Sequence, residues 1–314
     1  MNEFTAKLPV PLLLAPMAEI SHRAFRELIE SFGGCDGYFS EMISVGAFLD
    51  GGPFEKWYID NGPKPEKLVF QVVGSDSEQI FKAVSLLDRM ECAGIDINMG
   101  CSAPVIRKAG AGAAWMANID RAGELISRIR PAVKRRLSVK LRIGYKDGFE
   151  YLVRFCRRLE AEGTELIILH PRTVMEKFKR LSRWEYVGAL RQELNIPVAG
   201  NGDIADAQDL LKRASGPCDA VMTGRSAVRQ PWIFAKARAL SLTVPNLEET
   251  GLRFLELLAR YQPPEFHVSR AMRFFGFFCD NLKWGTYLKN QLNREKTLPG
   301  IEQVWREYFR ENEV

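Results

Sequence analysis

Residues 94–112 read Gly-Ile-Asp-Ile-Asn-Met-Gly-Cys-Ser-Ala-Pro-Val-Ile-Arg-Lys-Ala-Gly-Ala-Gly. Between residues 95 and 98 isoleucine alternates with a polar residue, which is the period of a short strand. The strand breaks at Gly100, and Cys101 follows where the backbone leaves the sheet. Periodicity therefore does not assign Cys101 to a core, and we interpret its thiol as a candidate acid or nucleophile.

Seven further runs of aliphatic or β-branched residues recur along the chain, most of them separated by helical patterns. Strand–helix alternation at this spacing is typical of parallel βαβ units. Eight units within about 240 residues favour a (β/α)8 TIM barrel over an open doubly wound sheet, and the first run lacks a Gly-x-Gly-x-x-Gly motif. The predicted strands are 10–15, 38–41, 68–73, 95–98, 138–142, 166–170, 197–199 and 220–223, with helices near 21–32, 77–92, 120–134, 148–162, 182–193 and 205–214.

The pattern changes after Ser241, where helical periodicity continues without a recognisable strand. Residues 247–261, 270–292 and 301–310 predict helices, and Pro263-Pro264 separates the first two. We therefore predict a barrel domain over residues 1–241 and a small all-helical domain over residues 242–314.

The composition is that of an ordinary globular protein, with 46% hydrophobic and 26% charged residues. No apolar run approaches the roughly 18 residues needed to span a membrane, and no signal peptide is visible. The six cysteines predict neither a disulfide framework nor a metal site, and Cys92 and Cys156 fit buried helical positions. We expect a cytoplasmic protein, monomeric by default, whose net charge of +5 is compatible with an anionic partner.

Polar residues gather where the predicted strands end, which in a TIM barrel is the face that carries the active site. Lys140 shares one face of its strand with Arg142, and a lysine inside a barrel is costly unless it meets an anion or an electron-rich ring. His170 closes an apolar run. The other strand-end candidates are Ala15, Pro16, Met17, Glu41, Gln71, Asn98, Asn201, Gly202, Asp203, Gly224 and Arg225.

Two glycine-rich turns follow the seventh and eighth predicted strands, where barrels commonly bind phosphate through backbone N–H groups. Asn201-Gly202-Asp203 and Gly224-Arg225 supply these turns, and Arg225 adds a positive charge. One phosphate site without a dinucleotide motif predicts flavin mononucleotide (FMN), with its ring over Lys140 and His170.

These motifs together resemble the tRNA-dihydrouridine synthase family. The resemblance rests on Asp96-Ile97-Asn98-Met99-Gly100-Cys101, Ala15-Pro16-Met17, His170-x-Arg172-Thr173, Asn201-Gly202-Asp203-Ile204 and Gly224-Arg225. It covers nearly the whole chain, since the tail resembles that family's RNA-binding helical domain. It implies an enzyme in which NADPH reduces FMN, hydride passes to C6 of specific uridines in tRNA, and Cys101 protonates C5.

The resemblance also implies roles for the strand-end residues. Asn98 would hold the uracil edge, and Arg172 would hold either the flavin or the substrate. Lys140 would stabilise the anionic reduced flavin. The predicted flavin site comprises Ala15, Pro16, Met17, Gln71, Lys140, His170, Asn201, Gly202, Asp203, Gly224 and Arg225.

A uracil inside folded RNA must be swung out, and the surrounding phosphates must be gripped by basic residues. We predict that Lys177, Lys179 and Arg180, which follow the sixth strand, contact the RNA. Arg183 belongs to the same cluster after the sixth strand. Further basic residues are expected at the same opening, from the Cys101 loop and from the tail: Arg107, Lys108, Arg270, Arg273, Lys283, Lys289, Arg294 and Lys296.

The sequence departs from the family pattern beside the cysteine. The family usually has proline directly after it and a lysine three or four residues on, where this chain has Ser102, Pro104 and Val105; Pro171 stands where glycine is common.

Two alternative functions stay open. One is an FMN-dependent oxidoreductase of a small molecule, which would need neither the tail nor the basic rim. The other is an RNA-binding relative with a changed target, such as ribosomal RNA, or with lost activity.

Overall fold

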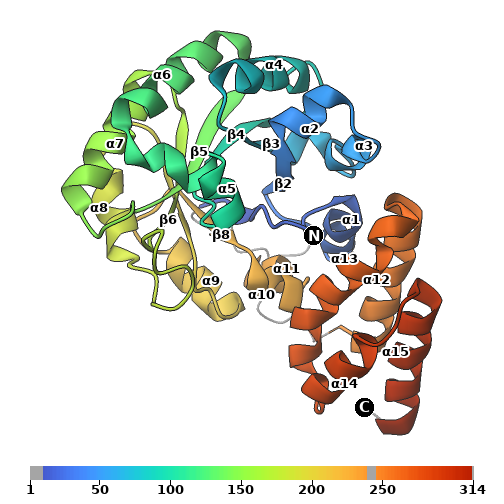
Figure 1. Ribbon diagram of the computed structural model, residues 1–314. Coiled ribbons are helices and arrows are strands. Elements are labelled where there is room, and N and C mark those ends of the chain that lie inside the picture. The colour runs from blue at the N-terminus through green and yellow to red at the C-terminus, as the bar shows by residue number, and fades with distance from the viewer. Residues whose placement is uncertain (1–9, 239–244, 313–314) are drawn as a thin grey trace, which may run out of the picture.

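A computed structural model describes residues 10–238 and 245–312 of the chain. Its eight parallel strands close into a barrel in sequence order, with β8 pairing back onto β1 (Figure 1). The predicted TIM barrel is confirmed. The strands are β1 Leu12–Leu14, β2 Gly37–Ser44, β3 Leu68–Val73, β4 Gly94–Met99, β5 Arg136–Arg142, β6 Leu166–His170, β7 Val198–Asn201 and β8 Ala220–Thr223.

The strands form where aliphatic residues are buried on both faces, against the barrel interior and against the surrounding helices. Every residue of β4, β6, β7 and β8 is buried, including the polar Asp96 and Asn98 that alternate with isoleucine in β4. Helices surround the barrel (Figure 1). They are α1 Arg23–Ser31, α2 Val45–Asp50, α3 Glu55–Tyr58, α4 Ser77–Leu87, α5 Pro104–Lys108, α6 Ile119–Ile129, α7 Phe149–Ala161, α8 Glu185–Glu193, α9 Ala207–Ala214, α10 Arg225–Arg229 and α11 Ile233–Arg238, with 3-10 turns at Pro65–Lys67, Gly112–Ala117 and Arg130–Ala132.

The described part of the tail contains four α-helices: α12 Leu247–Tyr261, α13 Pro264–Phe278, α14 Gly285–Leu292 and α15 Leu298–Asn312. The prediction of one helix over residues 270–292 is wrong. The helix begins earlier, because Pro264 is tolerated in the first turn, where its missing N–H costs nothing. It ends at Phe278, and the chain passes through a 3-10 turn and a left-handed Trp284 before α14 starts. The predicted domain boundary at residues 241–242 lies outside the described residues.

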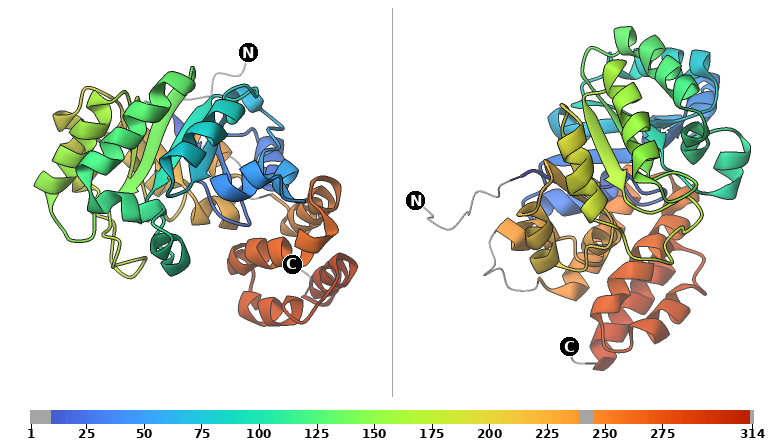
Figure 2. Two further views of the ribbon diagram at one scale, coloured as in Figure 1. Left: turned by 45° about the horizontal axis from the view of Figure 1, so that its top comes forward. Right: turned by 90° about the vertical axis from the view of Figure 1, so that its left-hand side faces the viewer.

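The tail lies to one side of the barrel and shares its hydrophobic core (Figure 2). Helix α12 packs on α1, and α13 packs on α10. The contact is aromatic: the rings of Phe25 and Phe274 lie 6.2 Å apart, and those of Trp232 and Phe278 lie 6.3 Å apart. Among the described residues, no helix is long and apolar enough to cross a membrane.

Candidate active site

A cavity of about 460 Å3 opens at the carboxyl ends of the strands, a volume within the usual range of small-molecule sites. Most of the predicted site residues line it. They are Ala15, Pro16, Met17, Asn98, Cys101, Lys140, His170, Lys177, Asn201, Gly202, Asp203, Gly224 and Arg225. The structure therefore brings together residues from β1, β4, β5, β6, β7 and β8 that the sequence analysis selected one strand at a time.

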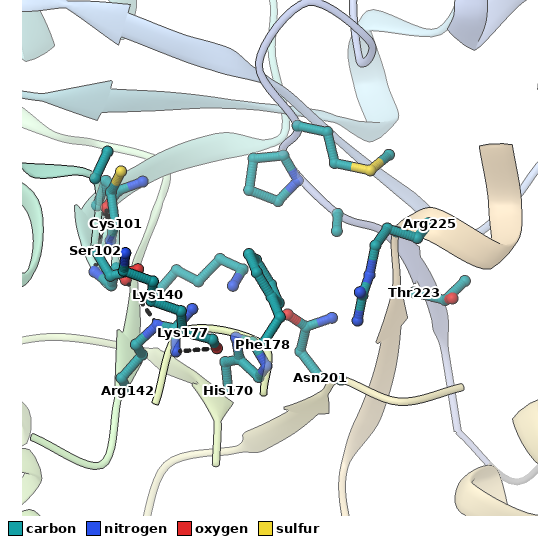
Figure 3. Close-up of a pocket in the computed structure, with 18 of the residues that line it drawn as sticks. Cys101, Ser102, Lys140, Arg142, His170, Lys177, Phe178, Asn201, Thr223 and Arg225 are labelled. Atoms are coloured by element: carbon teal, nitrogen blue, oxygen red, sulfur yellow. Dashed lines mark hydrogen bonds between the residues drawn. The ribbon is translucent and has the colours of Figure 1, made fainter. Parts of the chain in front are cut away.

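The cavity has two ends of different chemistry (Figure 3). Cys101 and Ser102 lie at one end, and Arg225 and Thr223 lie at the other. Lys140, His170 and Phe178 lie between them. A ligand that fills this cavity would place one end beside a thiol and the other beside a guanidinium group.

Cys101 is half-buried, whereas the other five cysteines are buried. Its backbone is held by Asn98, whose Oδ1 accepts hydrogen bonds from the N–H groups of Gly100 (3.1 Å) and Cys101 (2.9 Å). This side-chain turn fixes the path of the chain as it leaves β4. Asn98 thus supports the thiol directly and lines the cavity beside it.

Gln71 lies behind the cavity wall rather than on it. Its Oε1 accepts from Asn98 Nδ2 (2.9 Å), and its Nε2 donates to Asp96 Oδ2 (2.7 Å). The second oxygen of Asp96 accepts from Ser138 Oγ (2.6 Å). Gln71, Asp96 and Ser138 sit in register on neighbouring strands. Burial raises the pKa of Asp96 to about 6, although these two donors favour its charged form. The chain of hydrogen bonds fixes which way the Asn98 amide points.

Lys140 stands on β5, half-exposed to the cavity but surrounded by protein. Burial, reinforced by the nearby charge of Arg142, lowers the pKa of Lys140 to about 8. Burial removes water from the Lys140 ammonium group, and an anionic or electron-rich ligand would offset this loss of hydration.

Arg142 joins the two loops that frame the cavity. Its Nε donates to the carbonyl of Gly100 (3.1 Å), next to Cys101. Its Nη1 donates to the carbonyls of Thr173 (3.1 Å) and Lys177 (2.9 Å) in the loop after β6. One guanidinium group therefore sets the position of the cysteine loop relative to the β6 loop.

Arg172 also lies behind the wall. Its Nη2 contacts both carboxylate oxygens of Asp203 at 2.7 Å, and its Nη1 lies 3.1 Å from His170 Nε2. Burial and the surrounding cations lower the pKa of His170 well below its usual value. The ring is therefore neutral at pH 7, and we expect its proton on Nδ1, because Nε2 faces a donor.

Gly202 shows why the turn after β7 needs glycine. Its φ is +120°, and a Cβ there would lie 2.8 Å from Cδ2 of His170 and 2.5 Å from Ser182 Oγ. The neighbouring Asp203 carboxylate is occupied by Arg172 and by the Ser182 N–H (2.7 Å), and it lies 3.6 Å from Arg225. Asp203 therefore orients the cations of the site rather than offering a free charge to a ligand.

Three of the predicted RNA-contacting residues lie outside the cavity. Lys179 and Arg180 are exposed on the loop after β6, and Arg273 forms an ion pair with Glu19. Lys177, by contrast, lines the cavity. The expectation that Arg270 adds to a basic surface is wrong. Arg270 is 1% exposed and paired with Glu41, and Arg183 is engaged by Glu176 and Asp147.

Several cavity residues were missed by the sequence analysis. Phe178 is 58% exposed, yet its ring lies 6.0 Å from that of His170 and 4.8 Å from Cζ of Arg225. It belongs to an irregular loop, where periodicity gives no indication of direction. The other additional wall residues are Met42, Gly100, Ala103, Ile204, Thr223 and Ser226, together with Ser102, Pro104 and Arg142, which were noted without a site role.

The described part of the chain contains no group of three or more His, Cys, Asp or Glu side chains that could hold a metal ion. FMN fits the side chains that are present. Arg225 and the Gly224 turn form one end, where a Cβ on Gly224 would approach Met17 Sδ to 3.0 Å. Lys140 and neutral His170 stand in the middle of the cavity.

Comparison with known proteins agrees with this geometry. The family model described as dihydrouridine synthase (Dus) matches residues 13–277. The "tRNA-dihydrouridine(16) synthase" of Ralstonia nicotianae is 32% identical over 80% of this chain and 79% of its own length. The "probable tRNA-dihydrouridine synthase" of Aquifex aeolicus is 33% identical over 81% and 82%, respectively. The "tRNA-dihydrouridine synthase B" of Pseudomonas aeruginosa is 26% identical over 98% and 95%.

A closed barrel of eight parallel strands with a side-chain cavity at their carboxyl ends defines the class of TIM-barrel enzymes. Within that class, this chain belongs to the dihydrouridine synthase family.

Proposed function

We propose that this protein is an FMN- and NADPH-dependent tRNA-dihydrouridine synthase that reduces the C5=C6 bond of specific uridines. The observation that carries the proposal is the arrangement of one cavity, in which a half-buried Cys101 faces Arg225 across Lys140 and His170. Its similarity to proteins named tRNA-dihydrouridine synthases supports tRNA as the substrate. We further propose that it acts as a monomer in the cytoplasm.

In this proposal Arg225 and the Gly224 turn hold the cofactor phosphate, while Lys140 and His170 contact the ring. Lys140 offers a positive charge to the pyrimidine side of the ring, and neutral His170 offers an N–H donor. Bound flavin supplies the hydride that is added to C6 of the uracil. Arg172 and Asp203 contribute by fixing His170 and Arg225.

Cys101 acts as the general acid that delivers a proton to C5. A thiol suits this step because it retains its proton near neutral pH and releases it to a carbanion-like centre. Asn98 holds the loop that carries Cys101 and contacts the uracil edge. Lys177 and the exposed Lys179 and Arg180 lie on the same rim, where they contact RNA phosphates.

The pKa of Lys140 predicts how FMN affinity depends on pH. Because this pKa lies at about 8 without the cofactor, the lysine loses its proton above pH 8, whereas an anionic ligand favours the protonated form. FMN affinity should therefore fall between pH 7 and pH 9.5, by at most about tenfold per pH unit for one linked proton. Lys140→Met should bind FMN more weakly at pH 7 and lack this slope. Fluorescence titration of FMN across this pH range measures the affinity of both proteins. If the wild type and Lys140→Met show the same dependence of affinity on pH, Lys140 does not supply the charge that binds FMN.

The proposed function is tested by purifying the protein, recording its flavin spectrum, and incubating it with NADPH and unmodified tRNA. Digestion and mass spectrometry should reveal uridines that have gained two hydrogens. If the protein binds flavin but the RNA stays unmodified, the proposed synthase activity is contradicted. That result would favour an RNA-binding relative with lost activity or an FMN-dependent oxidoreductase of a small molecule. A protein that binds no flavin would contradict all three.

A further inference from the structure

A buried ion pair connects the barrel to the tail. Glu41, on β2, and Arg270, on α13, approach to 3.0 Å between Oε2 and Nη1, and their side chains are 2% and 1% exposed. Ion pairs at protein surfaces contribute little, but a pair removed this completely from water requires a defined geometry to offset the loss of hydration. The pair therefore allows only a narrow range of orientations of α13 on the barrel.

Arg270 is enclosed on its other sides by groups from both parts of the chain. Its Nη1 also donates to Gln262 Oε1, and its Cζ lies 4.6 Å from the ring of Phe266 and 5.6 Å from that of Tyr58. Tyr58 belongs to α3 of the barrel, and Phe266 belongs to α13 itself. The guanidinium group is thus fixed between the two parts.

The adhesion between barrel and tail comes mainly from aromatic packing. Phe274 of α13 packs on Phe25 of α1 with ring centroids 6.2 Å apart, and Phe266 of α13 packs on Phe54, directly before α3, at 4.8 Å. Apolar contacts are non-directional and tolerate sliding, whereas a buried ion pair does not. The aromatic side chains therefore hold the tail on the barrel, whereas the Glu41–Arg270 pair fixes its orientation.

The same pair reaches the cavity wall. Glu41 Oε1 accepts a hydrogen bond from the backbone N–H of Glu19 (2.6 Å), two residues after Met17, which lines the cavity. Glu19 adopts φ +62°, a conformation that a non-glycine residue keeps only when its surroundings hold it. Its carboxylate pairs with Arg273. Arg270 and Arg273 lie three residues apart on one face of α13. That face therefore contacts the loop after β1 directly through Arg273–Glu19 and indirectly through Arg270–Glu41.

We propose that Glu41 and Arg270 are positioning residues, which orient the tail relative to the cavity so that an RNA bound by the tail presents its nucleotide to Cys101. This inference rests on the proposed function. An orienting role and a purely stabilising role predict different results when both residues are replaced by apolar ones. If the pair orients the tail, the double variant should retain the fold and lose the alignment.

The test compares the wild type with Glu41→Gln and with the double variant Glu41→Leu/Arg270→Met. The single variant leaves a buried arginine without its partner, and its Tm should fall. The double variant should regain most of that Tm, because apolar side chains of similar volume commonly replace a buried ion pair without loss of stability. Its flavin spectrum and its rate of reduction by NADPH at saturating FMN should equal those of the wild type, whereas its FMN affinity reports separately on the loop after β1, because the Glu19 N–H loses its acceptor.

The steady-state constants for tRNA should nevertheless differ. If the aligned orientation falls to about a tenth of the population, KM for tRNA rises about tenfold while kcat at saturating tRNA changes little. Arg191→Gln is the matched control, since Arg191 pairs with Asp219 directly before β8, at the opposite end of the barrel. It should leave both constants unchanged.

A distance measurement tests the orientation without any reaction. In a Cys101→Ala background, Leu86→Cys on α4 and Tyr287→Cys on α14 provide exposed spin-label sites in the barrel and the tail, because the other five cysteines are buried. Double electron–electron resonance should give one narrow distance distribution, which broadens when Glu41→Leu/Arg270→Met is added.

The outcomes separate the inference from the proposed function. A broadened distribution with a raised KM supports the inference. An unchanged distribution, or a KM that recovers together with Tm in the double variant, overturns it and leaves the pair with a purely stabilising role. A wild type that binds flavin but reduces no uridine contradicts the proposed function, and the distance measurement still decides whether the pair sets the orientation.

Discussion

Cys101→Ala should lower the rate of uridine reduction by about 10²- to 10⁴-fold, the usual contribution of a positioned general acid. FMN binding and reduction by NADPH should remain, because Cys101 lies at the end of the cavity opposite Arg225. Cys101→Ser should be similarly slow, since a hydroxyl releases its proton far less readily than a thiol. Single-turnover reoxidation of the reduced flavin by tRNA measures this step separately from cofactor binding.

Cys156→Ala is the matched control for this prediction. Cys156 is buried on α7, outside the cavity, so its replacement removes a thiol without touching the site. Its rate should equal that of the wild type. A Cys101→Ala variant that keeps the wild-type rate would show that another group protonates C5.

Asn98→Ala should be the next most damaging change, lowering the rate by about 10²-fold, the cost of misplacing a reacting group by about 1 Å. The variant loses the acceptor that holds the N–H groups of Gly100 and Cys101, so the loop carrying the thiol is released. Asn98→Asp separates two roles, because it keeps this acceptor and loses the donor to Gln71. Single-turnover kinetics of both variants should place Asn98→Asp between Asn98→Ala and the wild type.

Asn118→Ala provides the control, since Asn118 caps α6 by accepting from the Arg121 N–H. It should lower the free energy of unfolding by about 1 kcal/mol and leave the reduction rate unchanged. If Asn98→Ala behaves like Asn118→Ala, the Asn98 turn is structural and does not position Cys101.

The barrel was predictable because its strands are short, buried on both faces and separated by amphipathic helices. The predicted bounds of β3, β6 and β8 equal the observed ones. The helix predicted over residues 270–292 was wrong because its break uses a left-handed Trp284, a residue type that gives no indication of such a turn.

The sequence was sufficient to predict which residues lie at the carboxyl ends of the strands, and therefore near the site. Whether a strand-end residue faces the cavity or lies behind its wall depends on contacts between strands. Gln71 hydrogen-bonds to Asp96 on β4, and Arg172 pairs with Asp203 in the turn after β7; neither pairing has a local signature in the sequence. The Arg270–Glu41 pair was missed for the same reason. A basic residue in a helical pattern is assigned to the solvent-exposed face unless the carboxylate that pairs with it is known.

The central claim is that one cavity couples a bound flavin to a uridine of tRNA, and a single stopped-flow measurement tests it most directly. The flavin is reduced with NADPH, and its reoxidation is followed with and without unmodified tRNA in the absence of oxygen. We predict rapid reoxidation that requires tRNA and is lost in Cys101→Ala. A reduced flavin whose reoxidation is indifferent to tRNA would contradict the account.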